Sequence, residues 1–211
     1  MSFLLSLFTT LALSATQAPK GSAETILAKF QQTWDNTATY QATFKQTVFS
    51  KQMGTSDLSE GELYVEKPSR LRWDTRSEGS LQILNGKTLT NVQTNARRKN
   101  RVVDIYRDVS KVLGSAPLKF LSGKAKFKDI YQIKLIAQTP EVAEMKLTPK
   151  GKGEDSLVVA VDKKSFFLKS LTTESVDSRV KIEFFDIKTN VKLDEKLFAF
   201  QPEAKDIVHQ E

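Results

Sequence analysis

The stretch Gly61-Glu62-Leu63-Tyr64-Val65-Glu66-Lys67-Pro68-Ser69-Arg70-Leu71-Arg72-Trp73 carries the pattern on which the fold prediction depends. Leu63 and Val65 alternate with polar or aromatic neighbours, which is the period of a half-buried strand. Pro68 interrupts that strand, because proline has no backbone N–H to donate to a β ladder. A second short strand is expected from Leu71 to Asp74, so the stretch predicts two consecutive strands.

The segment before this stretch predicts a helix followed by another strand. Apolar side chains recur at helical spacing between residues 23 and 34, at Ile26, Leu27, Phe30 and Trp34. After Asp35 the apolar period becomes two, with one face formed by Tyr40, Ala42, Phe44 and Val48. We interpret residues 51–59 as a polar turn region between this strand and the next.

The segment after it predicts more strands and one helical interruption. Asn85-Gly86 is a strong hairpin signal, and residues 102–106 form a further candidate strand. Residues 109–123 favour short helical pieces, because glycine and proline divide their apolar runs. From Ile130 the alternation recurs in short runs as far as Phe198 and Phe200. The sequence therefore predicts one mainly β domain with a few helices, an incomplete antiparallel barrel with a helical lid.

The first residues are typical of a secretory signal peptide. Phe3 to Leu13 are mostly apolar, and Thr16-Gln17-Ala18 fits the small-x-small pattern of a cleavage site. No lysine or arginine precedes the apolar run, which departs from the usual pattern. We predict that residues 1–18 are removed near Ala18 and that residues 19–211 form the mature domain. No cysteine follows the cut, so the mature protein is not predicted to be a lipoprotein itself.

Composition disfavours an enzyme. The 211 residues contain no cysteine and a single histidine, His209, near the chain end, where we expect a frayed tail. Catalysis by a serine triad or a zinc ion normally draws on histidine, and no nucleophile elbow, phosphate loop or Rossmann fingerprint is present. A hydrolase that uses carboxylates alone stays open as an alternative. We predict no cofactor and no metal site.

The net charge of +7 is weak evidence for an anionic partner. Its densest basic run, residues 97–101, is interpreted as a solvated turn. No aromatic RNA-binding motif accompanies it, so nucleic acid is not an expected partner.

The quoted stretch resembles the signature region of the outer-membrane lipoprotein carrier family, LolA. That family shows a glycine-led strand, a basic residue before proline and an arginine- and aromatic-rich strand ending in tryptophan. Further resemblances follow in order, at residues 44–47, 83–89, 116–121 and, for the closing strand, 198–202. The resemblance runs from about Ile26 to Val208. It implies a half-barrel with helices over a hydrophobic cavity.

The resemblance also implies site residues. The basic residue before proline, which in the family ties the barrel to lid carbonyls, falls on Lys67; the family usually has arginine there, and Arg70 is a candidate to share the role. The lipid-facing candidates are Tyr40, Phe44, Leu63, Leu71, Trp73 and Ile83 on the sheet, and Phe30, Trp34, Leu118, Phe120 and Leu121 on the lid. An ordinary core has the same period, so the pattern does not separate lining from core.

The function implied by the resemblance is that of a monomeric, periplasmic, non-enzymatic carrier. It takes acylated lipoproteins from an inner-membrane ABC exporter and delivers them to an outer-membrane receptor. The alternative left open is a carrier or sensor of another lipid or lipidated protein on the same fold, as in envelope-stress regulators that bind anti-sigma factors.

Overall fold

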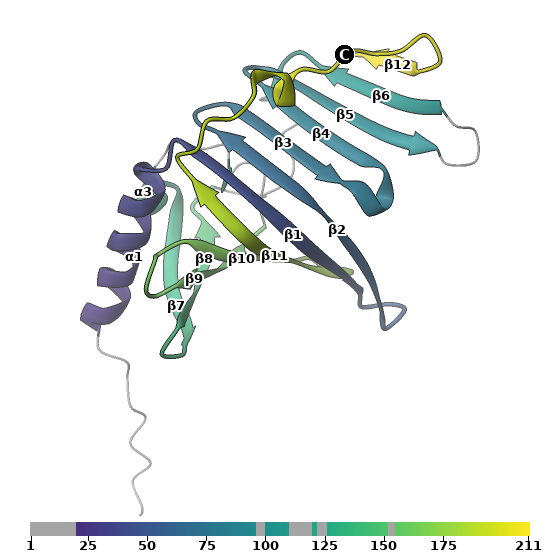
Figure 1. Cartoon of the computed structure of the whole chain (residues 1–211). Helices are drawn as coiled ribbons and strands as arrows, with labels where there is room; N and C mark the ends of the chain where they lie inside the picture. The colour runs from purple at the N-terminus through teal and green to yellow at the C-terminus, as the bar shows by residue number, and fades with distance from the viewer. Residues whose placement is uncertain (1–19, 96–99, 110–119, 122–125, 152–154) are drawn as a thin grey trace, which may run out of the picture.

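A computed structural model describes residues 20–95, 100–109, 120–121, 126–151 and 155–211 (Figure 1). Its main feature is one open, strongly curved sheet of twelve strands in the order β12-β6-β5-β4-β3-β2-β1-β11-β10-β9-β8-β7. The two end strands of this order do not pair with each other, so the sheet does not close. The predicted mainly β, unclosed barrel is therefore confirmed.

The elements follow one another as a meander with few helices. The first half consists of α1 (Lys20–Asp35), β1 (Thr39–Ser50), β2 (Thr55–Glu66), β3 (Arg70–Thr75), η1 (Arg76–Glu78), β4 (Ser80–Asn85), β5 (Thr88–Asn95) and β6 (Asn100–Tyr106). The second half consists of α3 (Phe127–Ile130), β7 (Tyr131–Gln138), β8 (Val142–Pro149), β9 (Leu157–Asp162), β10 (Leu168–Glu174), β11 (Ser178–Thr189), η3 (Glu195–Phe198) and β12 (Ile207–Gln210).

Strand pairing is antiparallel except at one edge. The long strands β1 and β11 pair along most of their length and join the two halves of the sheet. β12 runs parallel to β6, with Val208 opposite Val103. This parallel pair departs from the expected all-antiparallel barrel, because the chain returns across the sheet before it reaches the β6 edge.

One face of the sheet, here called the inner face, carries the main core. Leu63 lies opposite Trp73, and Val65 lies opposite Leu71. All four are buried, and they belong to one cluster with Phe30 of α1. The helix therefore packs on this face, where its apolar stripe finds the apolar stripes of the strands.

The opposite or outer face carries a second, smaller buried group. Ile83, Val92, Val103 and Phe198 are each at most 4% exposed, yet none belongs to the inner cluster. The segment after β11 crosses this face, because η3 contacts β3 and β4. Two outer-face side chains bind its backbone: Arg72 donates to the Leu197 carbonyl and Asn85 donates to the Phe198 carbonyl.

Several sequence predictions are wrong in detail. Phe198 ends a 3-10 helix rather than lying in a closing strand. His209 lies in β12 rather than in a frayed tail, since β12 finds a partner in β6. β2 begins at Thr55, within the expected turn region, because its polar residues extend the hairpin with β1. The predicted signal peptide and Leu118 lie outside the described residues.

Asn190 fixes the connection between α1 and the sheet. Its backbone has a φ of 56°, in the left-handed region that asparagine tolerates better than most residues. Its side-chain oxygen accepts from the Ala38 N–H at 2.7 Å, and its amide donates to the Asn36 carbonyl at 3.0 Å. The end of the helix is thereby tied to the end of β11. Within the described part of the chain, no helix is long and apolar enough to span a membrane.

Candidate functional site

Aromatic rings fill the space between α1 and the inner face. Phe30 stacks on Phe127 with ring centres 5.1 Å apart, and Phe127 stacks on Phe120 at 5.0 Å. Trp34 contacts Phe120 at 5.7 Å and Tyr40 at 6.1 Å. Offset ring contacts at these distances stabilise beyond simple area burial. The predicted lid side chains Phe30, Trp34, Phe120 and Leu121 therefore meet in one cluster on the inner face.

The predicted sheet residues mostly lie under this cluster. Tyr40, Phe44, Leu63, Leu71 and Trp73 are all buried and belong to the inner cluster. Phe44 and Trp73 contact each other with ring centres 5.0 Å apart. Burial raises the pKa of the Tyr40 hydroxyl, which donates to the Leu168 carbonyl at 3.3 Å and stays neutral at physiological pH.

Ile83 is a correction to the predicted lining. Its neighbour Leu84 lies opposite Leu71 on the inner face, whereas Ile83 lies opposite Arg72 on the outer face. Successive strand residues point to opposite faces, so the two cannot share a lining. Ile83 is only 2% exposed because the segment after β11, here called the C-terminal segment, covers the outer face. An apolar residue is therefore found on both faces of β4, and the sequence pattern did not show to which face Ile83 points.

Two grooves run along α1, one beside the sheet and one beside the residues around α3. One, of about 350 Å³, lies between α1 and strands β7 and β8, and its apolar lining includes Leu27, Tyr131, Ile133, Leu135 and Met145. The other, of about 450 Å³, lies beside Leu27, Gln31 and Lys126. Leu27 borders both. The helix is therefore flanked by open space on the side of β7, while its aromatic face is packed.

Lys67 links the turn between β2 and β3 to the end of α1. Its ammonium donates a hydrogen bond to the Trp34 carbonyl and lies 4.4 Å from the centre of the Trp34 ring. A cation at a helix C-terminus complements the helix dipole, and α1 has no basic residue of its own in its last turn. The cation–π contact adds to this attraction. The predicted contact between this basic residue and a helix carbonyl is present.

Arg70 is placed elsewhere. Its guanidinium lies 3.2 Å from a Glu66 carboxylate oxygen and 4.0 Å from one of Glu195. Arg70 pairs with Asn85, whose side chain binds the C-terminal segment across the outer face. The described contacts of Arg70 therefore run to carboxylates of the sheet and of η3, and the structure does not bring it to α1 with Lys67.

Comparison with known proteins agrees with this arrangement. Residues 35–201 match the family described as "Outer membrane lipoprotein carrier protein LolA". The chain belongs to the LolA family. An outer-membrane lipoprotein carrier protein of Coxiella burnetii (strain RSA 331 / Henzerling II) is 32% identical over 190 residues, covering 86% of each chain. LolA is a family of periplasmic carriers rather than of enzymes.

One solved structure shares this fold. A conserved protein from Thermus thermophilus, described as uncharacterized, has a TM-score of 0.52 at 14% identity, covering 90% of this chain and 99% of its own. The Pseudomonas aeruginosa MucA/MucB complex has a TM-score of 0.38 at 12% identity, covering 85% of this chain and 61% of the matched one.

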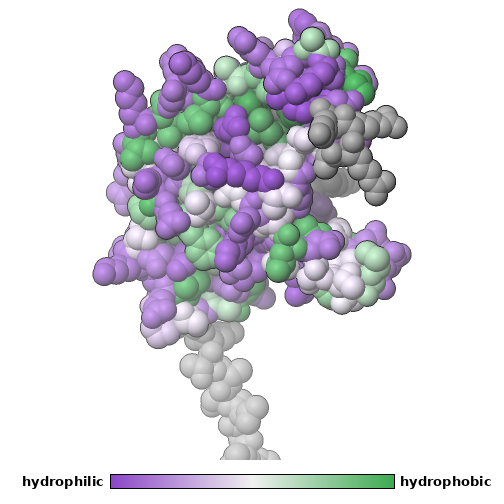
Figure 2. Space-filling view, turned by 45° about the vertical axis from the view of Figure 1, so that its right-hand side comes forward, coloured by the Kyte–Doolittle hydropathy of each residue, from purple (hydrophilic) through white to green (hydrophobic). Residues whose placement is uncertain are grey.

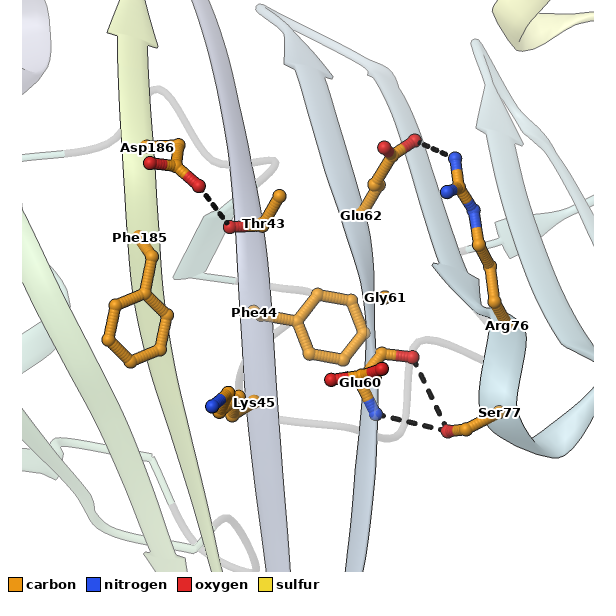
Figure 3. A pocket seen from close by; sticks show the side chains of 10 residues that line it. All are labelled: Thr43, Phe44, Lys45, Glu60, Gly61, Glu62, Arg76, Ser77, Phe185 and Asp186. Carbon is orange, nitrogen blue, oxygen red and sulfur yellow. Dashed lines mark hydrogen bonds and ion pairs between the residues drawn. The ribbon is translucent and has the colours of Figure 1, made fainter.

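The outer face of the LolA sheet also has a hollow, of about 750 Å³ (Figure 3). Thr43 donates to Asp186 in it, Glu62 pairs with Arg76, and the Lys45 ammonium lies 5.9 Å from the centre of the Phe185 ring. Charged and polar side chains line much of it, and it lies on the face opposite the aromatic cluster. It is therefore not the predicted apolar site.

The face of the LolA domain that Figure 2 shows is mainly hydrophilic. Figure 2 shows charged and polar side chains over most of the visible face, with smaller hydrophobic patches between them. The inner face, in contrast, gathers most of the buried aromatic side chains. The large apolar surface that a lipid carrier needs is thus concentrated on one face of the sheet.

Sequence reasoning missed several inner-face residues. Leu84, Leu89, Phe127 and Phe184 belong to the inner cluster and were not among the predicted lining residues. Phe184 contacts Tyr40 with ring centres 6.0 Å apart, in an edge-to-face arrangement. The period-two pattern of residues 180–184 contained a usable signal for Phe184. The hairpin at Asn85-Gly86 predicts that Leu84 and Leu89 lie opposite each other, but it does not specify the face that they share.

Proposed function

We propose that this protein carries lipoproteins across the periplasm, from an exporter in the inner membrane to a receptor in the outer membrane. The observation that carries the proposal is the aromatic cluster between α1 and the inner face, in a chain of the LolA family. The acyl chains of a lipoprotein would displace the aromatic side chains of α1 and take their place on the inner face of the sheet. Residues 1–18 would direct export as a signal peptide and be removed near Ala18.

The size of the inner apolar surface suits this task. Each methylene group moved from water to an apolar site contributes about 0.8 kcal/mol, so a sixteen-carbon chain left in water costs about 12 kcal/mol. A carrier therefore needs a surface that covers most of each chain. The inner face offers leucine, valine and aromatic side chains from both halves of the sheet.

Release requires that the empty carrier be stable in a closed form. The aromatic contacts of α1 and the hydrogen bond from Lys67 to the Trp34 carbonyl stabilise the helix on the sheet. Opening must break them, and this cost lowers the net affinity for cargo. We infer that Lys67 is the lid latch and sets part of that cost. The described contacts of Arg70 give it no share in this role.

The proposal is tested by native mass spectrometry of the protein isolated from the periplasm of cells with and without the lipoprotein exporter. We expect one triacylated polypeptide per protein molecule, and loss of that species without the exporter. A free lipid at the same stoichiometry would favour the alternative of a carrier or sensor of another lipid. Absence of any acylated species would contradict both.

A second arm tests delivery. Loaded protein is mixed with vesicles that contain or lack an outer-membrane lipoprotein receptor, and acylated polypeptide is followed by sedimentation. Transfer only to receptor vesicles supports directed delivery. Equal transfer to both kinds of vesicle would show passive release, which contradicts the receptor step but not the carrier role.

A further inference from the structure

The inner face changes chemistry along one row of cross-strand neighbours. Trp73 of β3 lies opposite Gln82 of β4, and Gln82 lies opposite Asn91 of β5. Asn91 in turn lies opposite Asp104 of β6. These strands lie side by side in Figure 1. The row formed by Gln82, Asn91 and Asp104, here called the polar row, thus continues the aromatic part of the inner face with hydrogen-bonding groups.

The next row along the same strands is apolar. It consists of Leu71, Leu84, Leu89 and Tyr106, each of which is the cross-strand neighbour of the next on β3, β4, β5 and β6. All four belong to the inner cluster or pack against it. Side chains two residues apart on a strand share a face and are neighbours on it. A hydrocarbon row and a hydrogen-bonding row therefore run next to each other across β3 to β6.

Asn91 has unused hydrogen-bonding capacity. Its Oδ1 atom is buried from solvent and has no hydrogen-bond partner among the described residues. A buried amide oxygen without a partner is unfavourable, so a partner is expected in some state of the protein. Asp104 beside it is held at the edge of the sheet by His209, whose Nδ1 lies 2.8 Å from a carboxylate oxygen.

We propose that the polar row binds the ester and amide groups that join acyl chains to the first residue of a lipoprotein. This inference rests on the proposed carrier function and assigns an orientation to the cargo. The acyl chains lie over the apolar row of Leu71, Leu84, Leu89 and Tyr106, since hydrocarbon placed over the carboxamides of the polar row would leave their hydrogen bonds unmade. Asn91 accepts an amide N–H through Oδ1, and the Gln82 and Asn91 amides donate to ester carbonyls.

The dimensions of the row fit such a linkage. Neighbouring strands lie about 4.8 Å apart, so Gln82 and Asp104 are separated by roughly 10 Å. Two ester groups and one amide on a glyceryl-cysteine unit spread over a comparable length. Carboxamides both donate and accept, so a single row can serve groups of either kind.

The experiment compares two ligands with the full mature chain. One is a synthetic peptide whose amino-terminal cysteine carries ester-linked and amide-linked palmitoyl chains. The other is a dihexadecyl glyceryl ether that has no ester carbonyl and no amide. Binding of each is measured by displacement of an apolar fluorescent dye from wild type, Asn91→Leu and Gln93→Leu. Gln93 is the matched control, because it lies on the same strand and face and its amide already donates to the Glu78 carbonyl at 3.1 Å.

We expect Asn91→Leu to weaken binding of the acylated peptide by about three- to tenfold, the value of one neutral hydrogen bond. Its binding of the ether should stay within about twofold of wild type, and Gln93→Leu should bind both ligands normally. If Asn91→Leu weakens binding of both ligands equally, or weakens binding of neither, the inference is overturned and Asn91 is a structural or water-binding residue.

A second variant protects the test against misfolding. If Asn91→Leu is destabilised in urea unfolding, Gln82→Met takes its place, and we expect it to weaken binding of the acylated peptide more than binding of the ether. A wild-type protein that binds both ligands alike, with unchanged variants, contradicts the polar row alone. A wild-type protein that binds neither ligand contradicts the carrier function, and the inference with it.

Discussion

The ammonium of Lys67 caps the last turn of α1 through the carbonyl of Trp34, although 33 positions separate the two residues in the chain. The same group lies over the indole ring of Trp34. One side chain of the turn between β2 and β3 thus contacts both the backbone and the Trp34 side chain of the helix that covers the inner face.

Removing this contact should change cargo transfer more than folding. A hydrogen bond from a charged donor contributes about 1.5–3 kcal/mol, so Lys67→Leu should make α1 easier to lift. We expect Lys67→Leu to remain folded, to bind the palmitoylated peptide about tenfold more tightly and to transfer it more slowly to receptor vesicles. Transfer is measured by sedimentation.

Lys67→Arg is the matched control for this variant. It keeps the charge and the donors, and it should transfer cargo at close to the wild-type rate. The latch idea is wrong if Lys67→Leu delivers cargo as fast as wild type.

The adjacent residues Ile83 and Leu84 provide a test of the two faces. Each is buried, so replacement by alanine should lower the free energy of unfolding by about 2–5 kcal/mol in either case. Only Leu84 lies on the inner face, so only Leu84→Ala should also weaken binding of the palmitoylated peptide. Urea unfolding and dye displacement measure the two effects. A similar loss of binding in Ile83→Ala would show that cargo does not use the inner face selectively.

Gly61 permits a close approach of β2 to its neighbours. A Cβ atom at this position would lie 1.9 Å from the Asp74 carbonyl oxygen and 2.8 Å from the Phe44 ring. Backbone cannot move aside as a side chain can, so Gly61→Ala should destabilise the domain by about 1–3 kcal/mol. Thermal or urea unfolding gives the measurement.

Gly151 offers the comparison for Gly61. A Cβ atom there would meet no atom of the described residues within 4 Å. Gly151→Ala should therefore leave stability unchanged or raise it slightly, because alanine reduces the freedom of the unfolded chain. If the two variants unfold alike, the close approach at Gly61 has no energetic consequence.

The attachment of the C-terminal segment should depend on pH. The Arg101 guanidinium donates to Asp206 at 2.6 and 2.9 Å, and this bond holds the pKa of that carboxyl below its usual range. A carboxyl whose pKa is lowered in the folded state stabilises the folded protein at pH values above the pKa of the unfolded chain, which is about 3.9. That contribution is lost as pH falls through the folded value.

Asp206→Asn should therefore be less stable than wild type at pH 7, and the difference should shrink below about pH 4. Urea unfolding of both proteins at about pH 7, 5 and 3 provides the test. An unchanged difference at the lowest pH would mean that the charge of Asp206 does not stabilise the C-terminal segment.

Much of the fold and of the site followed from local pattern. The alternation at Leu63 and Val65 and the helical spacing up to Trp34 each specified an element and its apolar face, and the Asn85-Gly86 turn specified a hairpin. The resemblance placed a basic residue at Lys67, and its contact with a helix carbonyl is present. The strands, the helix and the turn are decided by residues close together in the chain, which is why local pattern predicted them. The Lys67 contact joins residues 33 positions apart, and only the family resemblance pointed to it.

The tertiary structure alone decided which face each apolar residue of β4 uses. Ile83 and Leu84 are both apolar, and period two cannot orient a strand that is covered on both sides. The outer cover comes from η3, more than a hundred residues later, and β12 is ordered only because the edge of β6 is free to pair with it. Likewise, the polar row exists only in the register that sets Gln82, Asn91 and Asp104 side by side. Such relationships depend on long-range pairing, so no local pattern of residues contains them.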